Sequence, residues 1–447
     1  MSNSIPKGST LLRRNDFLFG VATASFQIEG ATDLGGRVPS IWDTFCATPG
    51  KVLGGDTGMP ACDHFHRWQQ DLDLIKSLGF DAYRFSIAWP RIASESGGWN
   101  QQGLDFYERL VDGLLERDIV PMATLYHWDL PQFLEDRGGW VNRDTSYRFA
   151  DYTDQVTRRL GDRVRYYATL NEPWCSAFLG YRLGIHAPGL KDHQLGFQAA
   201  HHLLLAHGLA LPIMREHAPG AQHGIVLNFT PAYPATESAA DVDAASYSDE
   251  ENSHFFLQPL LTGQYPAAVQ ERHPEWMPRC YPGDMETIAQ PLDFLGVNFY
   301  TRAVVEPGIT EDYQSIKQAD VARTDIGWEI YPQALTDLLV GFKERYKGLP
   351  PIYITENGAA DNSPVADGEV SDRLRLNYYQ QHLQAVDNAI AAGVDIRGYC
   401  AWSLMDNFEW AEGYSQRFGL VHVDYETQVR TPKLSAIWFR EMLDARS

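Results

Sequence analysis

Two glutamates in this sequence each follow a short run of apolar and β-branched residues and stand beside an amide side chain. The first lies in Thr-Leu-Asn171-Glu172-Pro173 and the second in Ile-Thr-Glu356-Asn357-Gly358. Such runs are typical of buried strands, so a carboxyl group at the end of two of them indicates a site rather than packing. Cleavage of a glycosidic bond needs such a pair, because the departing oxygen must be protonated while the anomeric carbon is attacked or stabilised.

One carboxyl group of such a pair must stay protonated near neutral pH while the other stays ionised. Repulsion between them raises one pKa, and a nearby guanidinium holds the other group charged. Arg84, within the apolar run 82–89, is the candidate for keeping Glu356 ionised. A salt bridge that only ties two strands together is the alternative role for this arginine.

Side chains suited to a sugar stand near the ends of other apolar runs. Those able to bind hydroxyl groups through directional hydrogen bonds are Gln27, His127, Asn171 and Glu409. Tryptophans offer flat faces to a pyranose ring, and the candidates are Trp128, Trp174, Trp328, Trp402 and Trp410. A further run ends with Asn298 and Tyr300. Packing in the core is the alternative for His127 and for the tryptophans, and it stays open above all for Trp174 and Trp328.

The elements that must position these residues alternate along the chain. Eight short apolar or aromatic runs are separated by longer stretches, at 17–24, 82–89, 120–127, 166–172, 223–229, 294–300, 351–357 and 396–404. Alternation of this kind predicts parallel βα units, and eight units predict a closed (β/α)₈ barrel of the α/β class. We expect one catalytic domain over 1–447, with long loops at 229–245 and 301–331 after the fifth and sixth strands.

The stretches between the runs have helical periodicity. Apolar residues step by three and four positions over 104–114 and over 379–390. For the second of these helices, Ser371 is the predicted N-cap and Gly393 the predicted end. A doubly wound open sheet is the alternative fold, and it is disfavoured because the first strand–helix turn has no G-x-G-x-x-G signature and no phosphate loop occurs.

Composition excludes several classes of partner. Thirty-seven basic and 58 acidic side chains give the 447 residues a formal net charge of −21. Such a surface repels phosphate backbones and anionic lipid, so we expect neither nucleic acid nor membrane partners. Residues 1–14 lack the apolar core of a signal segment. Because the five cysteines are scattered without a C-x-x-C pair, a reduced, cytoplasmic protein is expected. A secreted enzyme whose leader has been removed is the alternative.

Two groups of histidines resemble metal sites only superficially. One group is His64 and His66, and the other is His201, His202 and His207. Their spacing fits neither H-E-x-x-H nor a Cys/His finger, so helix packing and capping are favoured and no metal is expected.

Six segments occur in a fixed order along the chain. They are Phe19-Gly-Val-Ala-Thr-Ala-Ser-Phe-Gln27-Ile-Glu-Gly30, Tyr83-Arg-Phe-Ser86, Tyr126-His-Trp-Asp-Leu-Pro131, Thr169-Leu-Asn-Glu-Pro-Trp174, Ile354-Thr-Glu-Asn-Gly358 and Trp402-Ser-Leu-Met-Asp-Asn-Phe-Glu-Trp410. In this order they resemble glycoside hydrolase family 1, the β-glucosidase family. The motifs extend from about residue 17 to residue 440, so the resemblance covers nearly the whole chain.

The resemblance implies a (β/α)₈ barrel that hydrolyses β-glycosides with retention of configuration and without a cofactor. It makes Glu172 the general acid/base and Glu356 the nucleophile of a covalent glycosyl–enzyme intermediate. The implied binders of the non-reducing sugar are Gln27, His127, Asn171, Glu409 and Trp410, with Trp402 stacked beneath it. Further implied partners of the site are Asn298, Tyr300, which touches the nucleophile, and, on the leaving-group side, Trp174 and Trp328.

Two related groups of enzymes differ at positions that can be checked in this sequence. Thioglucosidases resemble this family but carry Gln in place of the acid/base, whereas this chain has Glu172. Phospho-β-glycosidases also resemble this family, but they carry Ser at the position of Glu409 and a nearby Lys for the phosphate. This sequence has Glu409, Trp410 and Gln416 instead. A glutamate would repel a 6-phosphate, so we expect an unphosphorylated carbohydrate as the partner.

Several functions stay open at this point. The same hydroxyl binders accept epimers, so a preference for glucose, galactose or fucose is not predicted. An endo-acting glycanase and a non-catalytic sugar-binding barrel are the competing functions. If Glu409, Trp410 and Gln27 close the cavity behind one sugar, exo cleavage is favoured, whereas an open cleft would favour endo cleavage. The presence of both glutamates argues against a protein that only binds sugar. The oligomeric state is not predicted.

Overall fold

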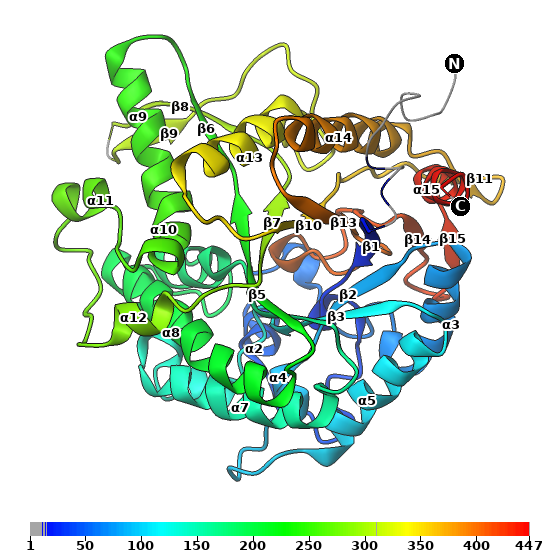
Figure 1. Cartoon of the computed structure of the whole chain (residues 1–447). Helices are drawn as coiled ribbons and strands as arrows, with labels where there is room; N and C mark the ends of the chain where they lie inside the picture. Colours follow the sequence, from blue (N-terminus) through cyan, green and yellow to red (C-terminus); the bar gives the residue numbers. More distant parts are fainter. Residues whose placement is uncertain (1–10, 12–13, 15, 310, 447) are drawn as a thin grey trace.

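A closed barrel of parallel strands forms the centre of the protein (Figure 1). The computed structural model describes residues 11, 14, 16–309 and 311–446. Around the barrel the order is β1–β13–β10–β7–β5–β4–β3–β2, and β1 pairs with β2 to close it. The strands are β1 (Leu18–Ala22), β2 (Ala82–Ser86), β3 (Val120–Tyr126), β4 (Tyr166–Asn171), β5 (Gln222–Phe229), β7 (Phe294–Phe299), β10 (Ile352–Asn357) and β13 (Ile396–Trp402).

Each of the eight predicted runs overlaps one barrel strand, so the prediction of a (β/α)₈ barrel is confirmed. The strands are apolar on both faces because one face lines the packed interior of the barrel and the other is covered by helices. Every residue of β7 and of β10 is buried, including the polar residues at their carboxyl ends.

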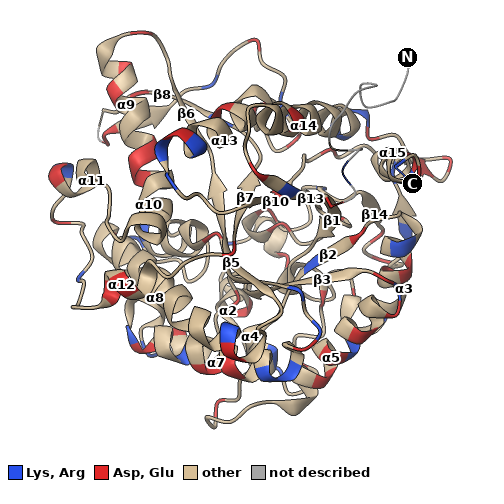
Figure 2. Cartoon of the chain, viewed as in Figure 1, with Lys and Arg blue, Asp and Glu red and all other residues tan. Residues whose placement is uncertain are grey.

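Helices surround the barrel, and charged residues of both signs occur along many of them (Figures 1 and 2). The longer ones are α3 (His64–Ser77), α5 (Gln101–Leu115), α7 (Asp144–Leu160), α8 (His193–His217), α13 (Gln333–Arg345), α14 (Arg373–Ala391) and α15 (Leu434–Asp444). Shorter ones are α1 (Ser25–Ile28), α2 (Ile41–Ala47), α4 (Trp89–Ile92), α6 (Gln132–Glu135), α9 (Ala239–Asp249), α10 (Phe255–Thr262), α11 (Ala267–Arg272) and α12 (Asp284–Ile288). The helical periodicity over 104–114 and 379–390 is confirmed by α5 and α14.

The predicted start of α14 is wrong by one residue, whereas its predicted end is confirmed. Asp372, not Ser371, is the N-cap, and its carboxylate accepts hydrogen bonds from Arg375 and Ser435 instead of capping the helix. The buried ion pair to Arg375 explains why the helix begins there, since a solvated Ser371 offers no such contact. At the other end Gly393 has φ +86°, the left-handed conformation that follows many helix ends.

The predicted long connections after the fifth and sixth strands, at 229–245 and 301–331, are confirmed, but they contain short elements that the sequence did not indicate. These stretches contain β6 (Ala232–Pro234), β8 (Ala303–Pro307), β9 (Tyr313–Ser315) and the start of α9. The three strands pair with one another in a separate sheet, in the order β6–β8–β9. β6 and β9 have only three residues each, and β8 has two adjacent buried valines, so none of them shows the alternation by which strands are predicted.

The histidines of the two predicted groups pack and form hydrogen bonds within the fold. His64 pairs with Asp71, and His201 contacts both Asp284 and Tyr265. Over the described part of the chain, no group of three or more His, Cys, Asp or Glu side chains is arranged to hold a metal ion. All five cysteines are free thiols.

Helices long and apolar enough to cross a membrane are absent from residues 16–309 and 311–446. Residues 1–10, 12, 13 and 15, on which the expectation about a signal segment depends, lie outside the described residues.

Candidate active site

The two glutamates lie at the carboxyl ends of β4 and β10 and line the same cavity of about 620 Å³. Glu172 follows the last residue of β4, and Glu356 is the penultimate residue of β10. Both are buried, with exposed fractions of 5% and 3%. Glu172 has φ +47°, an uncommon conformation for a residue with a side chain and one that occurs disproportionately at functional sites.

Glu356 is held by one cation and one hydroxyl group. Nη1 of Arg84 donates to its Oε1 at 2.6 Å, and the Tyr300 hydroxyl donates to its Oε2 at 2.7 Å. The ion pair is almost completely buried, which strengthens the electrostatic interaction compared with a surface pair. Arg84 therefore contacts the Glu356 carboxylate, as its predicted role requires. It also ties strands together, because Nη2 donates to Asn171 Oδ1 at 2.6 Å.

Within the described part of the chain, Glu172 contacts no cation and is held by neutral donors. Asn298 Nδ2 donates to Glu172 Oε1 at 2.6 Å and to Asn171 Oδ1 at 3.0 Å. The Cys175 thiol donates to Glu172 Oε2 at 3.0 Å. The two carboxyl groups are thus joined through one continuous network in which Asn171 accepts from both Asn298 and Arg84.

These different surroundings separate the acidities of the two glutamates. Burial, and after it the charge of Glu356, raises the pKa of Glu172 to about 8. Burial also raises the pKa of Glu356, but the charge and hydrogen bonds of Arg84 and the hydrogen bond from Tyr300 oppose this shift. Because only Glu356 is paired with a guanidinium, Glu356 loses its proton first and Glu172 keeps its proton at neutral pH.

A second set of polar groups surrounds the inner end of the cavity. Gln27 Nε2 donates to Glu409 Oε2 at 3.5 Å, and Asn171 Nδ2 contacts His127 Nε2 at 3.0 Å. Gln27 Oε1 and His127 Nδ1 are buried and have no partner among the described residues. A buried polar atom without a partner is costly, so these atoms fit a ligand that brings hydroxyl groups. Burial lowers the pKa of His127 well below its usual value, so the ring is neutral.

The Glu409 carboxyl group is itself unusual. Burial, followed by the charges of Glu356 and Glu172, raises its pKa to about 8. Glu172, Glu356 and Glu409 therefore share one cavity, and the exposed Glu412 is a fourth carboxyl group of its lining. The Arg84 guanidinium pairs with Glu356. A protonated Glu409 can both donate and accept hydrogen bonds, as vicinal sugar hydroxyls require.

Aromatic rings form the walls of the cavity. The His127 ring stacks with Trp402 at 5.9 Å and 17° and with Trp410 at 5.9 Å and 15°. Trp128 lies 4.5 Å from Trp410, centroid to centroid, and its indole N–H donates to the Asn171 carbonyl at 2.9 Å. Behind Trp410 lie Trp42 and Phe26, so this end of the cavity is closed by packed rings.

The structure brings all the predicted site residues together. Those lining the cavity are His127, Trp128, Glu172, Trp174, Asn298, Tyr300, Trp328, Glu356, Trp402, Glu409 and Trp410. The remaining three, Gln27, Arg84 and Asn171, contact cavity residues through the hydrogen bonds described above. Trp174 and Trp328 are half-buried, and each both lines the cavity and packs against the hydrophobic core.

Three further residues of the site were not predicted or only weakly indicated. Cys175 donates to Glu172, and the separation of three residues was the only available signal. Asn252 accepts the indole N–H of Trp174 at 2.9 Å from a segment 78 residues away, a contact that no sequence pattern reveals. Asn228, at the end of β5, lines the cavity, and its buried Oδ1 has no partner among the described residues.

Comparison with known proteins gives consistent matches over the chain. The model of glycosyl hydrolase family 1 matches residues 11–447. A β-glucosidase from Agrobacterium sp. is 50% identical over 432 residues, which are 95% of this chain and 94% of that protein.

Solved structures of related enzymes match the chain over nearly its whole length. A family 1 glycoside hydrolase from Thermotoga maritima, complexed with a cyclophellitol-analogue transition-state mimic, superposes with a TM-score of 0.94 at 45% identity and covers 97% of this chain and 98% of its own. The virulence factor SghA of Agrobacterium tumefaciens, complexed with its substrate analogue salicin, has a TM-score of 0.94 at 50% identity over 96% of this chain and 95% of its own. The chain belongs to glycosyl hydrolase family 1 and is an enzyme of the β-glucosidase type.

Proposed function

We propose that this chain is an exo-acting, retaining β-glucosidase of unphosphorylated β-linked glucosides, with Glu356 as the nucleophile and Glu172 as the general acid/base. The observation that carries the assignment of roles is the asymmetry between the two carboxyl groups. Glu356 is paired with Arg84 at 2.6 Å and accepts from Tyr300, whereas Glu172 is bonded only by Asn298 and Cys175 and has a pKa raised to about 8.

In the first step the ionised Glu356 attacks the anomeric carbon while Glu172 gives its proton to the glycosidic oxygen. The bond between the anomeric carbon and that oxygen breaks, and the leaving group departs as a neutral alcohol. Arg84 and Tyr300 hold the Glu356 carboxylate in place, so its attack does not need a large reorganisation. The product of this step is an ester between Glu356 and the sugar.

In the second step Glu172 acts as a base. The charge of Glu356 is one cause of the raised pKa of Glu172, and that charge disappears when Glu356 becomes an ester. The pKa of Glu172 therefore falls after the first step, and the carboxylate takes a proton from a water molecule. The oxygen of this water attacks the anomeric carbon, the ester bond breaks, and Glu356 returns as a carboxylate.

The closed inner end of the cavity supports exo cleavage. Gln27, His127 and Glu409 are grouped there, and the rings of Trp410, Trp42 and Phe26 pack behind them. One terminal sugar fits against such an end, whereas an endo-acting enzyme needs a cleft open on both sides. The lining also argues against a 6-phosphate, because it contains four glutamates and the nearby Arg84 guanidinium already pairs with Glu356.

We further propose that the chain acts as a single catalytic domain in the cytoplasm, on short β-linked glucosides such as those released from cellulose. The free state of all five cysteines supports a reducing compartment. The formal net charge of −21 supports a neutral carbohydrate partner rather than nucleic acid.

A panel of 4-nitrophenyl β-glycosides tests this proposal. We expect turnover of the β-glucoside, no turnover of its 6-phosphate or of the α-glucoside, and release of β-glucose as the first product in an NMR time course. First release of α-glucose would contradict the double displacement, because inversion follows from direct attack by water.

The pH dependence follows from the two carboxyl groups. Glu172 must be protonated in the first step, so we expect kcat/KM to fall as the pH rises through about 8, by about tenfold per pH unit. Glu356 must be ionised, so kcat/KM also falls as the pH decreases through the raised pKa of Glu356. A bell-shaped profile measured with 4-nitrophenyl β-glucoside, in buffers in which the enzyme stays folded, checks both limbs. A rate that keeps rising between pH 8 and pH 10 would contradict a protonated Glu172.

A further inference from the structure

The thiol of Cys175 is in direct contact with Glu172, the proposed general acid/base. Cys175 Sγ donates to Glu172 Oε2 at 3.0 Å, and the backbone N–H of Cys175 donates to the Glu172 carbonyl at 2.9 Å. One residue therefore holds both the side chain and the main chain of Glu172, whose φ is +47°. Cys175 is buried, with an exposed fraction of 6%, and it lines the catalytic cavity.

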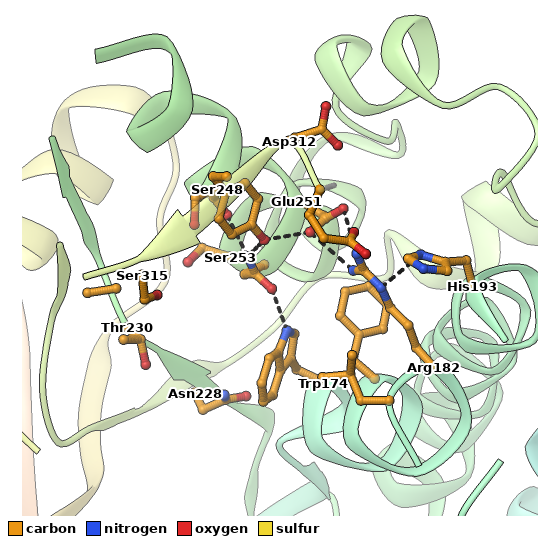
Figure 3. Close-up of a pocket in the computed structure, with 16 residues that line it drawn as sticks. Trp174, Arg182, His193, Asn228, Thr230, Ser248, Glu251, Ser253, Asp312 and Ser315 are labelled. Carbon is orange, nitrogen blue, oxygen red and sulfur yellow. Dashed lines mark hydrogen bonds and ion pairs between the residues drawn. The ribbon is translucent and has the colours of Figure 1, made fainter. Parts of the chain in front are cut away.

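The segment that carries this thiol is fixed at both ends. Cys175 is the first residue of a π-helix that ends at Arg182, and π-helices are found mostly at functional sites. Just before it, Trp174 Nε1 donates to Asn252 Oδ1 at 2.9 Å, and at the far end Arg182 Nη1 lies 3.1 Å from Glu251 Oε2 (Figure 3). Because Asn252 and Glu251 are adjacent in the chain, one neighbouring segment anchors both ends and keeps the thiol in its place.

Cys175 keeps its own proton in this position. Burial, and after it the charge of Glu172, raises the pKa of the thiol well above its usual value. The thiol is therefore neutral and acts as a hydrogen-bond donor to the carboxylate. A donor of this kind stabilises the ionised form of a carboxyl group and so lowers its pKa.

Other groups act on the pKa of Glu172 from several elements. Burial and the charge of Glu356 on β10 raise it, whereas the hydrogen bonds from Cys175 and from Asn298 on β7 and the charge of Arg84 on β2 lower it. The remaining titratable side chains of the cavity lining are His127, His186, Tyr300, Glu409 and Glu412. A substitution at position 175 changes the hydrogen bond at Oε2 and leaves all these groups in place.

A weak donor at Oε2 suits a carboxyl group that must act first as an acid and then as a base. Asn298 Nδ2 can only donate, so the proton that Glu172 transfers belongs on Oε2 rather than on Oε1. A strong donor to Oε2 would hold Glu172 ionised and hinder protonation of the leaving group. Without a donor, the return to the carboxylate in the second step would be hindered instead. A thiol, which donates only weakly, lies between these extremes.

We propose that Cys175 is a positioning residue for the acid/base: its thiol holds Oε2 of Glu172, the oxygen that carries the transferable proton, and thereby sets how readily Glu172 gives up that proton and takes it back. The proposal rests on the proposed function, since it needs Glu172 to donate a proton in the first step.

The test changes this hydrogen bond in two opposite directions. In Cys175→Ser a hydroxyl group, which is a stronger donor, replaces the thiol, and in Cys175→Ala the donor is removed. Cys46→Ser and Cys46→Ala are the matched controls, because Cys46 is a buried thiol on α2 outside the cavity lining. We measure kcat/KM against pH for cellobiose, whose leaving group needs a proton, and for 2,4-dinitrophenyl β-glucoside, whose leaving group does not. Thermal unfolding of each variant is recorded alongside.

For cellobiose, we expect the alkaline fall in kcat/KM to move to lower pH by about 0.5–1 unit in Cys175→Ser and to higher pH by a similar amount in Cys175→Ala, the size of one hydrogen bond. With the dinitrophenyl glucoside both variants should keep the profile of the parent, because the alkaline fall that remains there belongs to Glu409, whose pKa is also raised to about 8. The Cys46 variants should match the parent with both substrates.

Unchanged cellobiose profiles in both Cys175 variants would overturn the proposal. Shifts of both variants in the same direction would overturn it as well, because a change of packing alone produces them. If Cys175→Ala does not fold, Cys175→Ser decides: a shift to lower pH supports the proposal, and any other result overturns it. Failure of the proposed function is read separately, from the parent enzyme alone, as alkaline limbs of the same shape for cellobiose and for the dinitrophenyl glucoside.

Discussion

Glu356→Ala is expected to lower kcat/KM for 4-nitrophenyl β-glucoside by a factor on the order of 10⁴–10⁶, the size seen when a nucleophile is removed from a covalent mechanism. This corresponds to about 5–8 kcal/mol of transition-state stabilisation. The loss is large because no other group in the cavity can take over the attack. Glu172 keeps its proton at neutral pH, and Glu409, whose pKa is also raised to about 8, stands beside Gln27.

The control for this variant must separate chemistry from folding. Removing Glu356 leaves the Arg84 guanidinium buried without its partner, which is destabilising. Thermal unfolding is therefore measured together with activity, and sodium azide is added to fill the vacated space. We expect azide to restore turnover and to give an α-glycosyl azide, because attack from the Glu356 side inverts the anomeric carbon once. Glu441→Ala, on the exposed face of α15, is the surface control. Activity of Glu356→Ala within about tenfold of the parent would refute the nucleophile assignment.

For Glu172→Gln the expected loss depends on the leaving group. Proton donation to the leaving oxygen is worth roughly 10²–10⁴ in rate, so kcat/KM for cellobiose should fall by that factor. A 2,4-dinitrophenyl glucoside, whose leaving group needs no proton, should retain nearly all of its kcat/KM. The alkaline fall in kcat/KM that begins near pH 8 should become shallower, because Glu172 is one of two cavity groups whose pKa is raised to about 8 and only Glu409 remains.

Glutamine has nearly the same shape as glutamate, so Asn298 and Cys175 stay in contact with residue 172 and packing is preserved. Glu441→Gln on α15 serves as the matched substitution away from the site. Losses of equal size for cellobiose and for the dinitrophenyl glucoside would show that Glu172 positions the substrate without donating a proton.

The barrel was predictable because each of its strands is buried on both faces. Runs such as 351–357 consist of apolar and aromatic residues up to the catalytic end, and β10 (Ile352–Asn357) is buried throughout. The small sheet above it was not predictable. β6 (Ala232–Pro234) and β9 (Tyr313–Ser315) are held by pairing with β8, a contact between distant parts of the chain, rather than by any pattern within their own three residues.

The active site likewise has features that the sequence predicts and features that it does not. Residue type and position at a strand end were enough to find Glu172, Glu356 and Arg84, since carboxyl ends of barrel strands converge. The connections among them are a property of the fold. Asn298 lies 126 residues from Glu172 and Trp174 lies 78 residues from Asn252, and no local rule relates such positions.

The sheet formed by β6, β8 and β9 has a consequence for engineering. Its strands pair only with one another, while β5 and β7 pair directly within the barrel beneath it. The sheet can therefore be exchanged separately from the barrel. Replacing segments 230–235 and 301–316 by those of a relative that prefers another leaving group should change the leaving-group preference of this enzyme and leave Glu172 and Glu356 in place.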